Sequence, residues 1–300
     1  MKKRFLILFI AATMTFAACG KTEAETSPAV DSTVESTAQD VENTDSEDVV
    51  ADGGNQEITD YTEQIKSEVA EAKSAKSLQE ELDTIAELAE KYDELRMNSE
   101  TQTEMNENSQ WGLLVWDTEL NSLWSRMSDE LDSATKEEIL AKQRIWVAMK
   151  DNAANHLSAT YEGGSIWSMI YNDEQANITR RRAYVLANEY AKFKGEKFSM
   201  PARDNTGYFV DTQGTTDEYS SMTIEQGMEG DSLMFTVSLY RVGELRGYGE
   251  ATSDGITFES EDGNVKASIV VSYDGASFTV DEATDAIVNA GESFDFDLSF

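Results

Sequence analysis

The chain has 300 residues, and its 58 acidic residues against 24 lysines and arginines give a formal net charge of −34 at pH 7. This charge excludes nucleic acid as a partner, because the phosphates would be repelled, and it opposes docking on anionic lipid. The length is enough for about two domains, each with its own apolar core.

The first twenty residues have the pattern of a bacterial lipoprotein signal. Cationic residues 2–4 precede an apolar run over 5–16, and Cys19 follows two alanines. The run is shorter than the roughly 20 apolar residues that span a membrane, so we expect residues 1–18 to be a cleaved export signal. The Cys19 thiol would then take a diacylglycerol, in which each buried CH₂ contributes roughly 0.8 kcal/mol to anchoring.

These features predict a protein held by an acyl chain on the extracytoplasmic face of the cell membrane. Phe16 departs from the aliphatic residue usual three positions before the lipid-bearing cysteine. The alternative is a plain secretory signal in which Cys19 is incidental.

The next segment, residues 19–58, predicts a disordered acidic tether. Residues 19–60 hold twelve acids against Lys21, and no aromatic residue lies between Cys19 and Tyr61. Such a segment buries too little apolar area to offset the entropy of ordering, and its charges repel one another.

Residues 59–203 show the three-to-four-residue apolar spacing of helices. The spacing predicts one long helix with a stripe from Ile65 to Leu95, a polar break over 98–108, and further helices over 111–131, 133–157 and 178–193, with Gly163-Gly164 ending the third and Pro201 closing the region. Short loops between such stripes predict an antiparallel helical bundle.

Four short motifs lie in this helical region in a fixed order. They are Trp116–Asn121 followed by Trp124, Gln143–Trp146 with Lys150-Asp151, Glu162–Ser165, and Thr179 with Arg182. In order and spacing, over about 80 residues from Trp111 to Tyr190, they resemble the LprI-type lysozyme inhibitors. The resemblance implies a small helical domain whose best-known members bind and inhibit lysozyme. The chain differs in having no cysteine beside these motifs and in carrying Lys150 where arginine is common.

We expect most of the motif residues to be structural. They are Leu120, Asn121, Trp124, Gln143, Arg144, Trp146, Asp151, Thr179 and Arg182. Arg144 and Asp151 are two helical turns apart and cannot pair along one helix. The sequence suggests Asp117 or Glu119 as the partner of Arg144, and Arg182 as the partner of Asp151, with Gln143 as an amide partner for a guanidinium that would fix helix register.

The functional alternative places the partner contact in the loop Gly163-Gly164-Ser165. Glycine permits close backbone approach, and loops held by a rigid scaffold are common contact sites.

Residues 204–300 change to period-two alternation, which predicts strands. Six segments show it: 222–224, 233–240, 256–259, 265–273, 277–280 and 293–300. Phe235, Val237 and Leu239 would face one side of the sheet. The prediction is an antiparallel β-sandwich or small barrel, and for the whole chain an α+β architecture of a helical bundle followed by a β-rich domain.

Catalytic chemistry has little support in the sequence. His156 is the only histidine, and we expect it to pack or cap a helix. One histidine and an acylated cysteine exclude a histidine-rich metal site and a cysteine nucleophile, so the prediction is a non-enzyme with no metal site and no cofactor. A pair of glycosidase carboxylates stays open, although no residues single one out.

Three functions follow from these observations. The first is a surface-anchored inhibitor whose acidic body binds a cationic lysozyme or a related peptidoglycan hydrolase. The second is a general cell-envelope interaction or scaffold lipoprotein that keeps only the fold. The third is a carboxylate hydrolase acting on glycans.

Overall fold

The computed structural model describes residues 59–228, 230–253 and 255–300, first as a set of helices and then as a sheet. The predicted export signal, Cys19 and the acidic tether lie outside the described residues. The helices are α1 (Thr62–Ala72), α2 (Leu78–Met97), α3 (Gln102–Asn108), α4 (Gln110–Glu130), α5 (Ser133–Ser158), the short 3₁₀ helix η1 (Ala159–Tyr161) and α6 (Trp167–Lys194).

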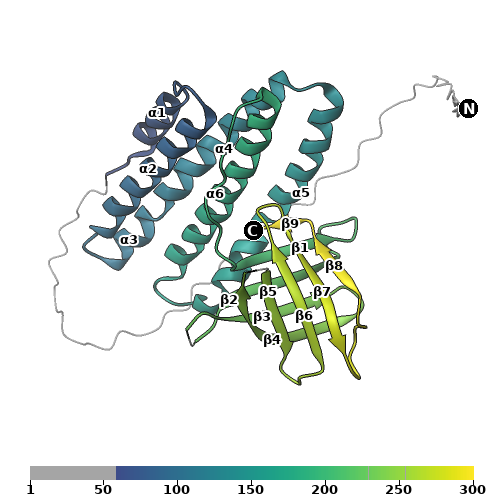
Figure 1. Ribbon diagram of the computed structural model, residues 1–300. Helices are drawn as coiled ribbons and strands as arrows, with labels where there is room; N and C mark the ends of the chain where they lie inside the picture. The colour runs from purple at the N-terminus through teal and green to yellow at the C-terminus, as the bar shows by residue number, and fades with distance from the viewer. Residues whose placement is uncertain (1–58, 229, 254) are drawn as a thin grey trace, which may run out of the picture. The chain divides into compact units, whose positions relative to one another are not determined.

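The helices form a bundle in which α4 packs against α1, α2 and α6, and α5 packs against α6 (Figure 1). The apolar stripes predicted from the sequence supply its core. Ile65, Leu82, Val115, Leu123 and Ile178 are all fully buried. Since most helical stability in proteins comes from packing an apolar face, the stripes are the main reason these segments are helical.

The helix boundaries correct the sequence prediction in three places. The single long helix is two, because the chain breaks after α1 and Ser77, in extended conformation, caps α2 by accepting a hydrogen bond from the backbone N–H of Glu80. The predicted polar break contains α3, which Thr101 caps in the same way. The last helix begins at Trp167 and not near Ile178. The first two corrections follow from side-chain capping of helix ends, which an apolar pattern does not reveal.

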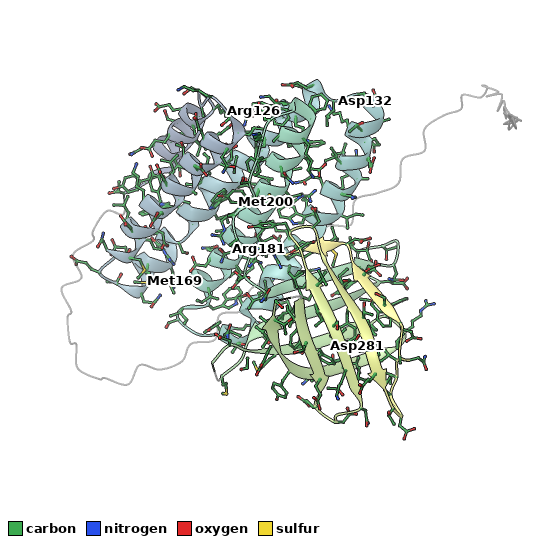
Figure 2. All side chains as sticks on the ribbon, in the orientation of Figure 1. Arg126, Asp132, Met169, Arg181, Met200 and Asp281 are labelled. Atoms are coloured by element: carbon green, nitrogen blue, oxygen red, sulfur yellow. The ribbon has the colours of Figure 1, made fainter. Side chains whose placement is uncertain are left out.

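The helix α5 begins at Ser133, as predicted, and its cap is the preceding residue (Figure 2 labels Asp132). The Asp132 carboxylate accepts hydrogen bonds from the backbone N–H groups of Ala134 and Thr135. Together with the bond from the Thr135 hydroxyl, they hold the pKa of Asp132 below its usual value.

The second part is a nine-stranded antiparallel sheet. Its strands are β1 (Gly207–Thr212), β2 (Tyr219–Gln226), β3 (Ser232–Leu239), β4 (Gly243–Thr252), β5 (Gly255–Ser260), β6 (Val265–Val271), β7 (Ala276–Ala283), β8 (Ser293–Phe296) and β9 (Leu298–Ser299). The order β8-β7-β6-β5-β4-β3-β2-β1-β9 is a meander, and only Asp297 separates β8 from β9. The last stretch of chain thus pairs with both ends of the sheet and forms a nearly closed barrel (Figure 1). The α+β architecture predicted from the sequence is confirmed. Of the two forms predicted for the sheet, a sandwich or a small barrel, the structure has the barrel.

The barrel interior is apolar and filled by side chains. Phe235, Val237 and Leu239 are buried while their neighbours along β3 are partly exposed, as the alternation predicted. Phe235 and Phe278 each make an edge-to-face contact with Phe258, with ring centroids 5.6 Å and 5.2 Å apart. The interior is therefore a packed core.

Two strands were missed by the sequence prediction, each for a physical reason. In β1, residues 207–210 are all buried, so no polar–apolar alternation appears. In β4, glycines replace the larger residues that mark strands. A Cβ on Gly247 would lie 2.5 Å from the Phe258 ring, and one on Gly249 would lie 1.7 Å from the Thr257 carbonyl oxygen. Only glycine lets β4 approach β5 so closely.

One face of the barrel packs on the bundle. Tyr208, Val210, Leu298 and Phe300 belong to the same apolar cluster as the helices. The Phe300 ring stacks against Trp146 of α5 at 6.3 Å. No helix among the described residues is long and apolar enough to cross a membrane.

His156 of α5 takes part in this contact. Its Nε2 is 2.8 Å from the Thr223 hydroxyl on β2, and its ring lies 4.5 Å from that of Tyr208. Burial lowers the pKa of His156, so it is neutral at pH 7 and packs between the two parts of the fold.

Candidate functional site

The motif residues of α5 and α6 meet along the contact between the two helices. Arg182 of α6 donates from Nε to the Gln143 side-chain oxygen on α5 at 2.7 Å. The same guanidinium lies 5.9 Å from the centroid of the Trp146 ring. Gln143 and Trp146 are buried, so this amide–guanidinium–indole group fixes how α5 sits against α6.

A second polar contact lies along the same strip. The buried Gln175 side chain of α6 donates to the Asp151 carboxylate at 2.8 Å and to the Tyr171 hydroxyl at 2.9 Å. Thr179 is fully buried, and its hydroxyl donates to the Gln175 carbonyl oxygen. We call Gln143, Trp146, Asp151, Gln175, Thr179 and Arg182 the α5–α6 strip. Its side-chain hydrogen bonds are made within the fold, as expected for residues that position helices.

The partners suggested from the sequence are wrong for two residues. Asp151 accepts from Gln175 and not from Arg182, which bonds to Gln143. Arg144 points outward and pairs with Glu137 of its own helix at 2.7 Å, with its side chain 62% exposed. Arg144 lies next to Gln143 in sequence but on the solvent side of α5, so it cannot reach α4.

Glu119, one of the two partners that the sequence suggested for Arg144, instead lies beside the partly buried Arg126 of α4. Arg126 donates to both oxygens of Glu81 on α2, and its Nη2 is 3.6 Å from the Glu119 carboxylate. Glu119 is fully buried, and neither oxygen has a hydrogen-bond partner among the described residues. Burial, and then the nearby charge of Glu81, raise the pKa of Glu119 to about 8.

This cluster had a signal in the sequence. Glu119 stands between Trp116 and Leu120, both buried, and one turn after Val115. An acid at a core position of an apolar helical stripe predicts a buried carboxylate, which needs a cation or a proton.

The remaining motif residues of α4 do not form a site. Leu120 is part of the bundle core, and Trp124 packs against it from a partly buried position. Asn121 is exposed and donates to the Asp117 carboxylate and carbonyl of its own helix.

The loop Gly163-Gly164-Ser165 lies exposed between η1 and α6. Gly163 has a φ of +76°, a left-handed conformation that favours glycine, and a Cβ on Gly164 would lie 3.0 Å from the Tyr161 carbonyl oxygen. The Ser165 carbonyl accepts from the Asn106 side chain of α3 at 2.7 Å. The loop thus has a defined shape, is tied to a neighbouring helix, and presents its outer side to solvent.

The structure offers no metal centre in the part of the chain that it describes, since no group of three or more His, Cys, Asp and Glu side chains is placed to hold an ion there.

Comparison with protein families bears on this region directly. The model of the family described as lysozyme inhibitor LprI matches residues 93–186. This segment is therefore similar to the LprI-type domains. The match confirms the resemblance inferred from the four motifs, all of which lie inside it. Neither the comparison with curated proteins nor that with solved structures gave a match.

The LprI segment, as we call residues 93–186, covers the end of α2, the whole of α3, α4 and α5, and most of α6. It includes the α5–α6 strip and the exposed glycine loop. Its core is completed from outside, by Ile65, Leu82 and Ile85 of α1 and α2 and by Phe300 of the barrel. Experiments on its function should therefore use the longer chain.

Proposed function

We propose that this protein is a membrane-anchored, extracytoplasmic lipoprotein that binds and inhibits lysozyme or a related cell-wall hydrolase. The observation that carries the proposal is the family match over residues 93–186, which form a folded helical region with an exposed, ordered loop. LprI is an inhibitor family, which agrees with a binding role and not with catalysis.

The charge of the chain supports the same partner. Lysozymes of the chicken type are cationic, and a chain of net charge −34 would attract them from a distance. Complementary charge mainly speeds association and makes it sensitive to salt. The shape of the binding loop must then supply the specificity.

One observation favours a second function, that of an envelope interaction or scaffold lipoprotein without inhibition. The motif residues of the α5–α6 strip bond to one another inside the fold. If these internal contacts account for the family match, the match reflects the fold of the bundle and not a shared partner. The glycine loop is then the one motif that is free to contact a partner.

The first experiment measures lysis of a cell-wall suspension by chicken-type lysozyme in the presence of residues 20–300 at physiological salt. Salt at this level removes the nonspecific attraction that any acidic chain has for lysozyme. Inhibition at near-stoichiometric concentration supports the proposal. Absence of inhibition by a protein shown to be folded would favour the scaffold function.

A pair of matched variants tests the loop. Ser165→Arg adds bulk and positive charge beside the two glycines, and because Ser165 contacts Asn106 only through its carbonyl, the fold should be kept. Ser125→Arg makes the same charge change at an exposed position of α4. We expect only Ser165→Arg to weaken inhibition, by tenfold or more. Equal loss in both variants would mean that charge alone attracts lysozyme.

The anchor is tested separately on the whole chain in bacterial cells. We expect the protein to incorporate labelled palmitate and to fractionate with membranes, and Cys19→Ala to abolish both. Membrane retention of the Cys19→Ala variant without label would show that the leader, and not a lipid, holds the chain.

A further inference from the structure

A cleft in the helical region includes no residue of the glycine loop or of the α5–α6 strip in its lining. It is formed by α2, α4 and α6, by residues 201–204 that follow the bundle, and by Tyr273 from the turn after β6. Its volume is about 620 Å³. Sites for small molecules have volumes of roughly 300–1,000 Å³, so the cleft has the size of a ligand site.

Four of the chain's ten arginines line this cleft, which is unusual for so acidic a protein. They are Arg96, Arg180, Arg181 and Arg203. Figure 2 labels Arg181 on α6. A concentration of guanidinium groups in a concave site is the usual means of binding carboxylate or phosphate, because each guanidinium can donate two parallel hydrogen bonds.

Four acids, Glu90, Asp93, Asp173 and Asp204, line the same cleft, but they are not shared evenly among the arginines. Arg96 is buried and held by Asp93 and by both oxygens of Asp173, at 3.0 and 3.1 Å, so its role is structural. Arg181 has Asp204 at 3.5 Å and donates to the Phe300 carbonyl oxygen at 2.8 Å.

The other two arginines have no acid partner among the described residues. Arg180 is exposed at the cleft, and no carboxylate of the described chain lies within 4.0 Å of its guanidinium. Arg203 donates to the Ser299 hydroxyl and lies 4.7 Å over the Phe209 ring, while its Nε and Nη1 are buried without a partner in the described chain. Burial, and then the charge of Arg181, lower the pKa of Arg203 to about 10. Adjacent guanidinium groups repel each other, and a bound anion would relieve that repulsion.

The rest of the lining suits a ring. Tyr273 supplies partly exposed aromatic surface, and Asn177 supplies an amide that can donate and accept. Small residues leave room between them, since a Cβ on Gly112 would meet nothing within 4 Å. Aromatic surface with a few polar groups beside it is typical of sites that bind sugars and other rings.

We propose that this cleft binds a small ligand in which a carboxylate or phosphate is attached to a ring the size of a sugar, with the exposed Arg180 holding the oxyanion. Arg181 and Arg203 add positive potential. The inference does not rest on lysozyme inhibition, since the cleft and the glycine loop are separate surfaces.

Three sugars that differ at one substituent test it by titration calorimetry on residues 20–300 at physiological salt. N-acetylmuramic acid carries a carboxylate, N-acetylglucosamine 6-phosphate carries a phosphate, and N-acetylglucosamine carries neither. We expect at least one of the two anionic sugars to bind at least tenfold more tightly than the neutral one, and the comparison between them identifies the oxyanion. Equal binding of all three, or no binding of either anionic sugar at millimolar concentration, would overturn the proposal.

Matched variants locate the binding. Arg180→Gln removes an exposed guanidinium that has no acid partner in the described chain, so it should leave the melting temperature unchanged and weaken binding of the anionic sugar about tenfold. Arg144→Gln removes an equally exposed arginine from α5, outside the cleft, and should leave binding unchanged. Equal weakening in both variants would show that the anion responds to overall charge and that the cleft is not its site.

Discussion

The bundle and the barrel differ in what they bury. The bundle core encloses charged and amide groups, namely Glu81, Arg96, Glu119, Gln143 and Gln175. The barrel interior is apolar, and the buried polar residues of the described strands are small hydroxyl side chains such as Ser220 and Ser260. The hairpins between neighbouring strands fix the register of the barrel, so apolar packing is enough to select one arrangement of its side chains. Helices can slide and rotate, so polar contacts such as that of Arg182 with Gln143 select one packing among several.

The largest expected effect tests whether the two regions unfold together. Phe278 is fully buried at the centre of the barrel, and Phe278→Ala should cost about 4 kcal/mol through lost burial and a cavity. All five tryptophans belong to the bundle. Because Tyr208 and Phe300 of the second region pack into the bundle core, we expect tryptophan fluorescence to report the lower urea midpoint as well. If the fluorescence midpoint stays unchanged while the β-sheet circular dichroism signal is lost at lower urea, the two regions unfold independently.

The buried acid of the bundle should make that region sensitive to pH. The pKa of Glu119 is about 8 in the folded protein against an ordinary value of 4.5. A carboxyl whose pKa is raised by folding loses native stability as pH increases: its contribution is intact below pH 4.5 and is lost as pH rises through 8.

Glu119→Gln keeps the shape and removes the ionisation. We expect the variant to be more stable than the parent at pH 9, by on the order of 2 kcal/mol, and the two to converge near pH 4.5. Melting temperatures across this range measure the effect. If the melting temperatures of parent and variant change with pH in parallel, Glu119 is ionised throughout this pH range and its charge is balanced by a neighbouring cation.

A smaller effect is expected in the α5–α6 strip. Asp151→Ala removes one acceptor of Gln175, whose amide keeps its bond to Tyr171, so the loss should be about 1 kcal/mol. Lysozyme inhibition, once corrected for the folded fraction, should be unchanged. A variant that melts like the parent yet fails to inhibit would move the partner surface to this strip.

The smallest effect is expected at the outward-facing motif residue. Arg144 and Glu137 form an exposed ion pair, and Arg144→Ala should change the unfolding free energy by less than about 0.5 kcal/mol. Urea titration at low and high salt measures it. A loss above roughly 1 kcal/mol, the upper end for exposed pairs, would show that Arg144 has a buried partner after all.

Much of the architecture was predictable from the chain. The stripes beginning at Ile65, Trp111 and Ile139 correspond to helices, and the alternation at Phe235, Val237 and Leu239 corresponds to a strand with one buried face. These patterns reflect local geometry, since the period of each element determines which side chains share a face. The four motifs likewise indicate the LprI segment by their order and spacing along the chain alone.

Tertiary structure alone decided which polar groups meet. Arg126 and Glu81 are 45 residues apart, and Arg181 and Phe300 are 119 apart, so no local pattern relates them. Sequence order placed Arg144 beside Gln143 and suggested a shared role, but the turn of α5 puts one in solvent and the other in the core. The closure of the barrel and the gathering of four arginines in one cleft depend in the same way on segments far apart in the chain. The sequence by itself determined most of the helices, most of the strands and the resemblance of the bundle to LprI-type domains, because these follow from local periodicity and motif spacing. Strand pairing, barrel closure and the cleft follow from how distant faces pack.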